Sequence, residues 1–162
     1  MSVYSDQDYV AISPAAVYGL ELEQVFRTIN QTRTAMGRRR LRSWLFHPLK
    51  SPAAILQRQA GVTLLKQQPQ LHEQLDTLLR GLPDVEKCLS KLSCGYMHNR
   101  DLLALRQALE KVPRLQPALE PLSAKNRLFT LEDIPDLRQR LCRAINPDMP
   151  LTKSEGKVIR KG

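Results

Sequence analysis

The sequence contains none of the short patterns that mark a nucleotide or hydrolase site. It has no G-x-x-x-x-G-K-[ST] phosphate loop, no G-x-G-x-x-G turn and no G-x-S-x-G motif. His72-Glu73 lacks the second histidine of a zinc-protease helix. Spacing reveals no convergent set of polar groups that would suit catalysis, so we do not expect this chain to be an enzyme.

Long apolar runs are also lacking, because charged residues interrupt every hydrophobic stretch within a few positions. No segment approaches the length of a transmembrane helix, and we expect no contact with a membrane. The N-terminus, MSVYSDQDYV, lacks the basic start and apolar run of a secretory signal. Three cysteines form an odd set, which does not predict a disulfide framework. These absences indicate a soluble cytoplasmic protein.

The cysteines do not form a recognisable metal site. Cys88 and Cys94 are further apart than the cysteine pairs of structural zinc sites, which have roughly two to four intervening residues. His98 and Cys142 could complete a ligand set, but small buried thiols are the better interpretation. We therefore expect neither a metal nor any other cofactor in this chain.

Aromatic residues make up only 5% of the chain, and valine and isoleucine are few, whereas leucine and helix formers such as Gln, Arg, Ala and Glu are frequent. This composition predicts an all-α fold. The 162 residues, 42% of them hydrophobic, suffice for one domain with its own core.

Apolar periodicity and capping residues predict a multi-helix bundle. The expected helices begin at Ser13-Pro14, span 22–29 and 34–46, begin at Ser51-Pro52, and then span 69–79, 84–92, 99–112 and about 137–145. We expect Asn99 to cap its helix and Gly61 to interrupt the helix that contains it. Pro113, Pro117 and Pro121 are expected to break the stretch after residue 112 into short pieces.

Positive charge dominates the sequence: the net charge is +9, and residues 27–50 carry seven cations and no carboxylate. Such a balance suggests an anionic partner, of which DNA or RNA is the commonest. Arg38 and Arg42 share one helix face and are candidates for contacts with DNA or with a neighbouring domain. Arg39 and Arg40 point elsewhere, so ion pairing within or between domains is favoured over a phosphate-binding stripe. Asp84 and Glu86 suit a helix N-terminus better than an acid–base pair.

The order of residues is more specific than their charge. Residues 34–49 follow the pattern T-x-x-G-x-R-x-L-x-x-W-L-x-x-P-L, which closely resembles the core or lever domain (domain III) of the MutS family of DNA mismatch-repair ATPases. Similar segments follow in the family's order, one at 84–86 (D-x-E), one at 100–102 (R-D-L) and one at 156–162 (G-x-[VI]-I-x-x-G). The matching positions are Thr34, Gly37, Arg39, Leu41, Trp44, Leu45, Pro48, Leu49, Asp84, Glu86, Arg100, Asp101 and Leu102.

The resemblance implies a non-catalytic domain that links the ATPase to the DNA clamp and transmits nucleotide-dependent conformational change. It implies a helical core domain at 12–147 and a junction toward a clamp or lever helix at 148–162, with a short strand or turn near 156–162. The polar residues at 1–11, which lack apolar periodicity, predict a flexible N-terminal segment. Gly37, Leu41, Trp44 and Pro48 are expected to pack a junction with the Trp44 ring in the core.

Partners follow from the same resemblance. It implies contacts with the clamp, connector and ATPase domains, double-stranded DNA held by the parent protein, and a dimer of that parent. ATP and Mg²⁺ would bind in an ATPase domain that this chain does not contain. The alternative from the charge alone is a free-standing basic helical adaptor that binds DNA or RNA directly.

Overall fold

The structure is a computed structural model, and it describes residues 8–146. This part of the chain is helical and contains no β-strand, which confirms the all-α prediction. The helices are α1 (Pro14–Gly19), α2 (Leu22–Ile29), α3 (Ala35–Phe46), α4 (Pro52–Lys66), α5 (Pro69–Leu79), α6 (Val85–Ser93), α7 (Asn99–Ser123) and α8 (Pro135–Ala144), with a 3-10 turn η1 (Arg127–Phe129) before α8. None of these helices is long and apolar enough to cross a membrane. The strand or turn predicted near 156–162 lies outside the described residues.

Local sequence signals set most helix starts. The Ser13, Thr34 and Ser51 hydroxyls each accept a hydrogen bond from a backbone N–H of the first helical turn that follows. Proline occupies the first position of α4 and α5, where its missing N–H costs nothing. These starts agree with the sequence prediction. The α7 cap does not, because His98 precedes the helix and Asn99 is already its first residue.

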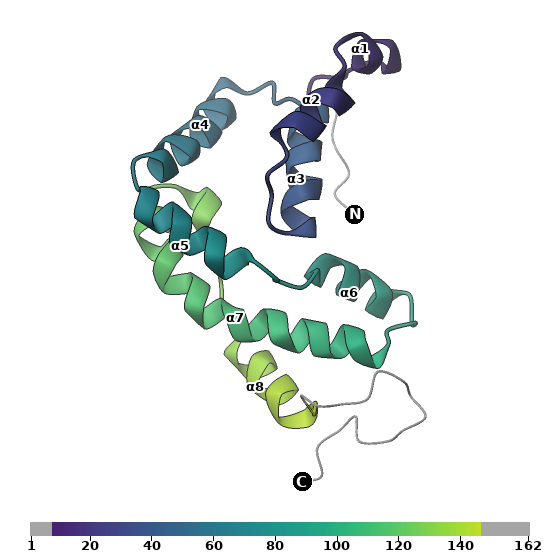
Figure 1. Cartoon of the computed structure of the whole chain (residues 1–162), viewed down its shortest axis with the longest axis vertical. Coiled ribbons are helices and arrows are strands. Elements are labelled where there is room, and N and C mark those ends of the chain that lie inside the picture. Colours follow the sequence, from purple (N-terminus) through teal and green to yellow (C-terminus); the bar gives the residue numbers. More distant parts are fainter. Residues whose placement is uncertain (1–7, 147–162) are drawn as a thin grey trace.

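The helices fall into two unequal groups (Figure 1). The main core lies between α5 and α7, where Leu75, Leu115, Ala118 and Leu122 are buried against one another. The group α1 to α3 has a smaller buried centre, Leu22 and Phe26 of α2, and α3 has no buried residue. In Figure 1, α3 lies between α2 and the beginning of α6, with its N-terminal end toward α6, while α4, α5 and α7 curve round the other side.

The prediction that Gly61 interrupts its helix is wrong, because α4 continues through it to Lys66. Gly61 is buried, and a Cβ at this position would lie 3.3 Å from Asn126 Nδ2. The absent side chain lets buried Asn126 donate from Nδ2 to the Gln57 carbonyl at 2.8 Å. Asn126 also accepts from the Leu128 N–H, so one side chain fixes η1 to α4.

The prediction that three prolines break the chain after residue 112 is also wrong. Pro113, Pro117 and Pro121 lie inside α7 and are exposed, since a spacing of four residues places all three on the same helix face. The opposite face carries buried Leu115 and Leu122. Water can solvate the carbonyls that lost their helical partners, and the buried face preserves the helix. Figure 1 shows α7 running beside α6 and then turning along α5, as expected of a proline-bent helix.

Pro117→Ala should raise the free energy of unfolding by about 1–3 kcal/mol, because it restores an N–H donor to the Pro113 carbonyl. Urea unfolding followed by circular dichroism measures this difference. Arg114→Ala, at an exposed α7 position that already has its N–H, is the matched control and should change stability by less than about 0.5 kcal/mol. A less stable Pro117→Ala variant would mean that α7 requires the bend in order to pack on α5.

Candidate functional site

The motif at 34–49 forms a capped helix and the turn that follows it. Thr34 Oγ1 accepts from the Gly37 N–H at 2.9 Å, and a Cβ on Gly37 would lie only 3.0 Å from that hydroxyl. The missing side chain of Gly37 therefore leaves room for the Thr34 hydroxyl that caps the helix. At the other end of the motif, the Pro48 carbonyl accepts from the Val10 N–H at 2.8 Å, and Leu49 forms an antiparallel bridge with Tyr9. This backbone pairing ties residues 8–10 to the motif.

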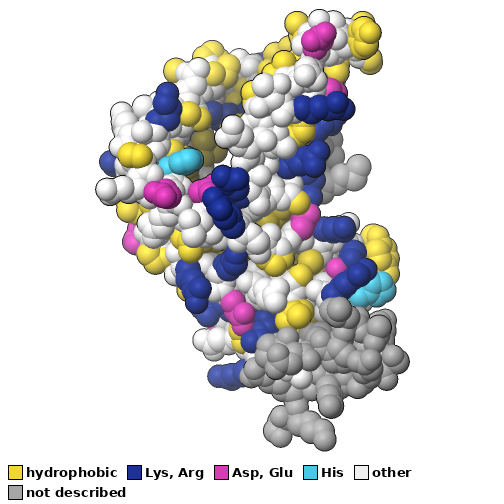
Figure 2. All heavy atoms as spheres, in the orientation of Figure 1, with side chains coloured by type: hydrophobic (Ala, Val, Ile, Leu, Met, Phe, Trp, Pro, Cys, Tyr) yellow, Lys and Arg dark blue, Asp and Glu magenta, His cyan; other side chains and the backbone are white. Residues whose placement is uncertain are grey.

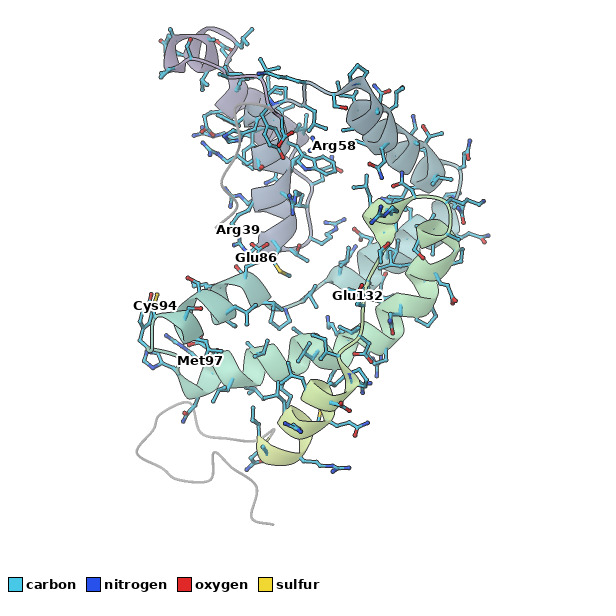
Figure 3. All side chains as sticks on the ribbon, turned by 180° about the vertical axis from the view of Figure 1, so that it is seen from behind. Arg39, Arg58, Glu86, Cys94, Met97 and Glu132 are labelled. Carbon is cyan, nitrogen blue, oxygen red and sulfur yellow. The ribbon has the colours of Figure 1, made fainter. Side chains whose placement is uncertain are left out.

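Arg39 connects two motif segments that are far apart in the sequence. Its two terminal nitrogens donate to the two carboxylate oxygens of Asp84, each at 2.7 Å. Nε and Nη2 also donate to Glu86, at 3.0 and 2.7 Å. Figure 3 shows Arg39 beside Glu86 where the N-terminal end of α3 meets the start of α6. A planar guanidinium suits such bidentate pairing, and a lysine ammonium does not.

Asp84 has a second role in the same place. One of its oxygens accepts from the Lys87 N–H at 3.1 Å, which caps α6. The Arg39 guanidinium, more than any other group, holds the pKa of Asp84 below its ordinary value, and burial opposes this shift. The same contact raises the pKa of Arg39. Capping was the sequence interpretation of this carboxylate, and the structure adds the ion pair to it.

A second ion pair joins the same two groups of helices. Arg33, in the loop before α3, donates to Asp76 of α5, which also pairs with Arg80 at 2.8 Å. Hydrogen bonds from Arg33, then Arg80, lower the pKa of Asp76 to about 2. We call the five residues Arg33, Arg39, Asp76, Asp84 and Glu86 the arginine clasp. The sequence analysis missed the pairing of Arg33 with Asp76, and no motif position signals it.

The remaining α3 side chains are only partly covered. Trp44 is half-buried, with the Arg58 guanidinium 4.2 Å from its ring centroid, so the prediction of a core tryptophan is wrong. Leu41 and Leu45 are likewise half-buried. The physical reason is that α3 makes its main helix contact with α2 and contributes no residue to the buried core between α5 and α7.

Arg38 and Arg42, the candidate contacts for DNA or another domain, differ in the structure. Arg42 forms an ion pair with Glu23 and stacks 4.2 Å from the Phe46 ring centroid. Arg38 is exposed, 5.9 Å from the Phe26 centroid. Their contact with DNA or another domain stays a prediction. Figure 2 shows Lys and Arg side chains along the α2–α3 side interspersed with carboxylates, so the visible face carries no unbroken cationic stripe.

The third motif segment lies elsewhere, at the start of α7. Buried Asp101 accepts from the His98 N–H at 3.0 Å and from Lys91 Nζ at 2.6 Å, which links α6 to α7. Arg100 is exposed and Leu102 half-buried. The structure thus brings Arg39, Asp84 and Glu86 together and places the 100–102 segment at the far end of α6.

The cysteines and histidines do not converge. Cys88 is buried, Cys94 is exposed and Cys142 is half-buried, and all three are free thiols. Residues 8–146 contain no group of three or more His, Cys, Asp or Glu side chains that could hold a metal ion.

Comparison with known proteins decides the family. The family model described as MutS domain III matches residues 15–161, which include every segment of the arginine clasp. This chain belongs to the MutS domain III family. It is 33% identical over 169 residues to the DNA mismatch repair protein MutS of Persephonella marina, covering 98% of this chain and 19% of that protein. It is 34% identical over 172 residues to the protein of the same name from Streptococcus pyogenes serotype M4, covering 98% and 20%.

The MutS proteins are much longer than this sequence. The chain spans about a fifth of the length of the curated relatives it matches. The match runs across both helix groups, so the domain III family includes the α1–α3 group as well as the main core.

The lowered pKa of Asp76 predicts that the Arg33–Asp76 contact contributes to stability in a pH-dependent way. Because its folded-state pKa of about 2 lies below the ordinary 3.8, ionised Asp76 stabilises the fold above pH 3.8, and this contribution disappears as pH falls through 2. Asp76→Asn should therefore unfold more easily than the wild type at neutral pH, with the difference shrinking between pH 4 and 2. Urea unfolding across this range measures it.

Glu132→Gln is the control, since Glu132 is an exposed carboxylate without an ion pair among the described residues. Its stability difference from the wild type should stay small at every pH. A constant difference between Asp76→Asn and the wild type from neutral pH down to 2 would contradict the role of ionised Asp76.

Proposed function

We propose that this chain serves as the core or lever domain of a MutS-type DNA mismatch-repair ATPase. In this role it links the ATPase to the DNA clamp and transmits nucleotide-dependent conformational change, without catalysis of its own. Its partners would be the clamp, connector and ATPase domains, double-stranded DNA held by the parent protein, and a second subunit. The free thiols suit a reducing cytoplasm.

The observation that carries this proposal is the arginine clasp. A connector can transmit motion only if its parts move as one body. The α1–α3 group has little buried core and no buried residue on α3, so apolar packing alone gives it weak attachment to the rest. Arg39 attaches the α1–α3 group more firmly, through four charged hydrogen bonds to the start of α6. Ion pairs of this kind fix the relative orientation of the two helix groups without a large buried surface between them.

The half-covered side of α3 supports the same role. Leu41, Trp44 and Leu45 are only half-buried in this chain, and a neighbouring domain could cover them. Domain interfaces within one chain are commonly of modest area and mixed polarity, as this surface is. The motif residues at 34–49 would then serve internal capping at one end of α3 and domain contact along its side.

Nucleotide chemistry belongs outside this chain in our proposal. The sequence has no phosphate-binding loop, and the described residues offer no cluster that fits Mg²⁺. The residues present do not fit ATP, so no step of the ATPase cycle is assigned to them.

In a full-length MutS-type protein that carries this domain, Arg39→Ala should weaken the effect of ATP on DNA affinity. Loss of the clasp lets the α1–α3 group move separately, so the ratio of DNA dissociation constants with and without ATP should fall by about threefold or more. ATP hydrolysis without DNA should stay unchanged. Fluorescence anisotropy and a phosphate-release assay measure the two quantities.

Arg42→Ala is the matched control, because Arg42 lies one turn further along α3 and pairs with Glu23 inside the α1–α3 group. It should preserve the ratio. If Arg39→Ala has the wild-type ratio, the clasp does not take part in transmission.

The rival function is a basic adaptor that binds DNA or RNA directly, and the net charge of +9 favours it. Titration of the 162-residue chain with duplex DNA at low and physiological salt separates the two. A domain without its own DNA site should bind weakly at physiological salt. Micromolar binding with a steep salt dependence would instead support the adaptor, because released counterions drive such binding.

A further inference from the structure

Trp44 of α3, the single tryptophan of the chain, has Arg58 of α4 over its ring and Arg40 one helical turn before it. The Arg58 guanidinium of α4 lies over the Trp44 ring, 4.2 Å from its centroid. Arg40 precedes Trp44 by one turn of α3, so both side chains lie on the same face. Figure 3 shows Arg58 reaching from α4 toward the side chains of α3.

Within the described part of the chain, Arg40 and Arg58 lack the carboxylate partner that several nearby arginines have; Arg38 also lacks one, but it is exposed and lies near Phe26. Arg33, Arg39 and Arg42, which flank them in sequence, each pair with Asp or Glu. Among residues 8–146, neither Arg40 nor Arg58 forms an ion pair. The chain has 25 cations and 16 carboxylates, and an unpaired cation can usually extend into water.

Arg58 is not extended into water. It is half-buried against Trp44, and burial lowers its pKa; Tyr9 opposes that shift, whereas Arg40 adds to it. Partial desolvation and a like charge both disfavour the charged form, so the arrangement costs free energy as it stands. An anion between the two guanidiniums would offset both effects.

We propose that Arg40 and Arg58 form a binding site for a carboxylate on an acidic protein segment. Stacking on Trp44 fixes the plane of the Arg58 guanidinium and leaves its N–H edge free to donate to two oxygens. Charge complementarity with a chain of net charge +9 favours an acidic partner. The site lies beyond the proposed lever role and does not depend on it.

A protein carboxylate fits this site better than a DNA backbone does. Duplex DNA presents a row of phosphates, and its recognition requires a row of cations. The nearest α3 arginines do not extend the site into a row, because Arg42 is held by Glu23 and Phe46 while Arg38 lies near Phe26. Two guanidiniums suit one carboxylate better than they suit a row of phosphates.

Trp44 supplies the measurement, since its emission reports directly on the Arg58 contact. Titration of the full 162-residue chain with a terminally blocked hexaglutamate peptide at low salt should change Trp44 fluorescence in a saturable manner. Arg58→Gln and Arg40→Gln should each raise the dissociation constant for the peptide by about tenfold. Isothermal titration calorimetry measures the same constant independently of fluorescence. Arg140→Gln, an exposed α8 position, is the matched control and should bind as the wild type does.

Circular dichroism verifies that each variant is folded, and exposed Arg40 provides a test with little structural risk. Unchanged Trp44 emission on peptide addition would overturn the proposal. So would a folded Arg58→Gln or Arg40→Gln variant that binds hexaglutamate as tightly as the wild type. Tighter binding of duplex DNA than of the peptide, lost in Arg58→Gln, would also overturn the proposal and would identify the ligand as nucleic acid.

Discussion

The paired hydrogen bonds between Arg39 and Asp84 are the interaction on which the arrangement of the two helix groups depends. Asp84 caps α6 and accepts hydrogen bonds from both terminal nitrogens of Arg39, so one carboxylate connects the start of α6 to α3. Glu86 accepts two further hydrogen bonds from the same guanidinium, from Nε and Nη2. Because α3 buries no residue of its own, charge rather than apolar area holds it here.

The main core, in contrast to α3, is held together by buried apolar side chains. Leu75, Leu115, Ala118 and Leu122 exclude water between α5 and α7, and such packing is insensitive to salt. Ion pairs near the surface weaken as ionic strength rises. The domain therefore combines a salt-independent body with a salt-dependent attachment.

Most helix starts could be predicted from the sequence because their cause is local, although the α7 cap is His98 and not Asn99. Thr34, Ser51 and Pro69 predict helix starts, because a capping residue or a first-turn proline acts only on the next few residues. Sequence reasoning failed at Gly61 and at Pro113, Pro117 and Pro121, where the outcome depends on which helix face is buried. The motif contained Arg39, Asp84 and Glu86, but no spacing rule pairs residues 45 positions apart. Arg58, outside the motif, could not be connected to Trp44 at all.

The gap left by Gly61 has a consequence for how this sequence can change. Asn126 donates to the Gln57 carbonyl beside Gly61, and a Cβ at position 61 would lie 3.3 Å from Asn126 Nδ2, so one of the two would have to shift. A larger residue at 61 would displace the amide, and a smaller residue at 126 would leave a void beside the glycine. The two positions are thus coupled across 65 residues of chain, and relatives that alter one should alter the other.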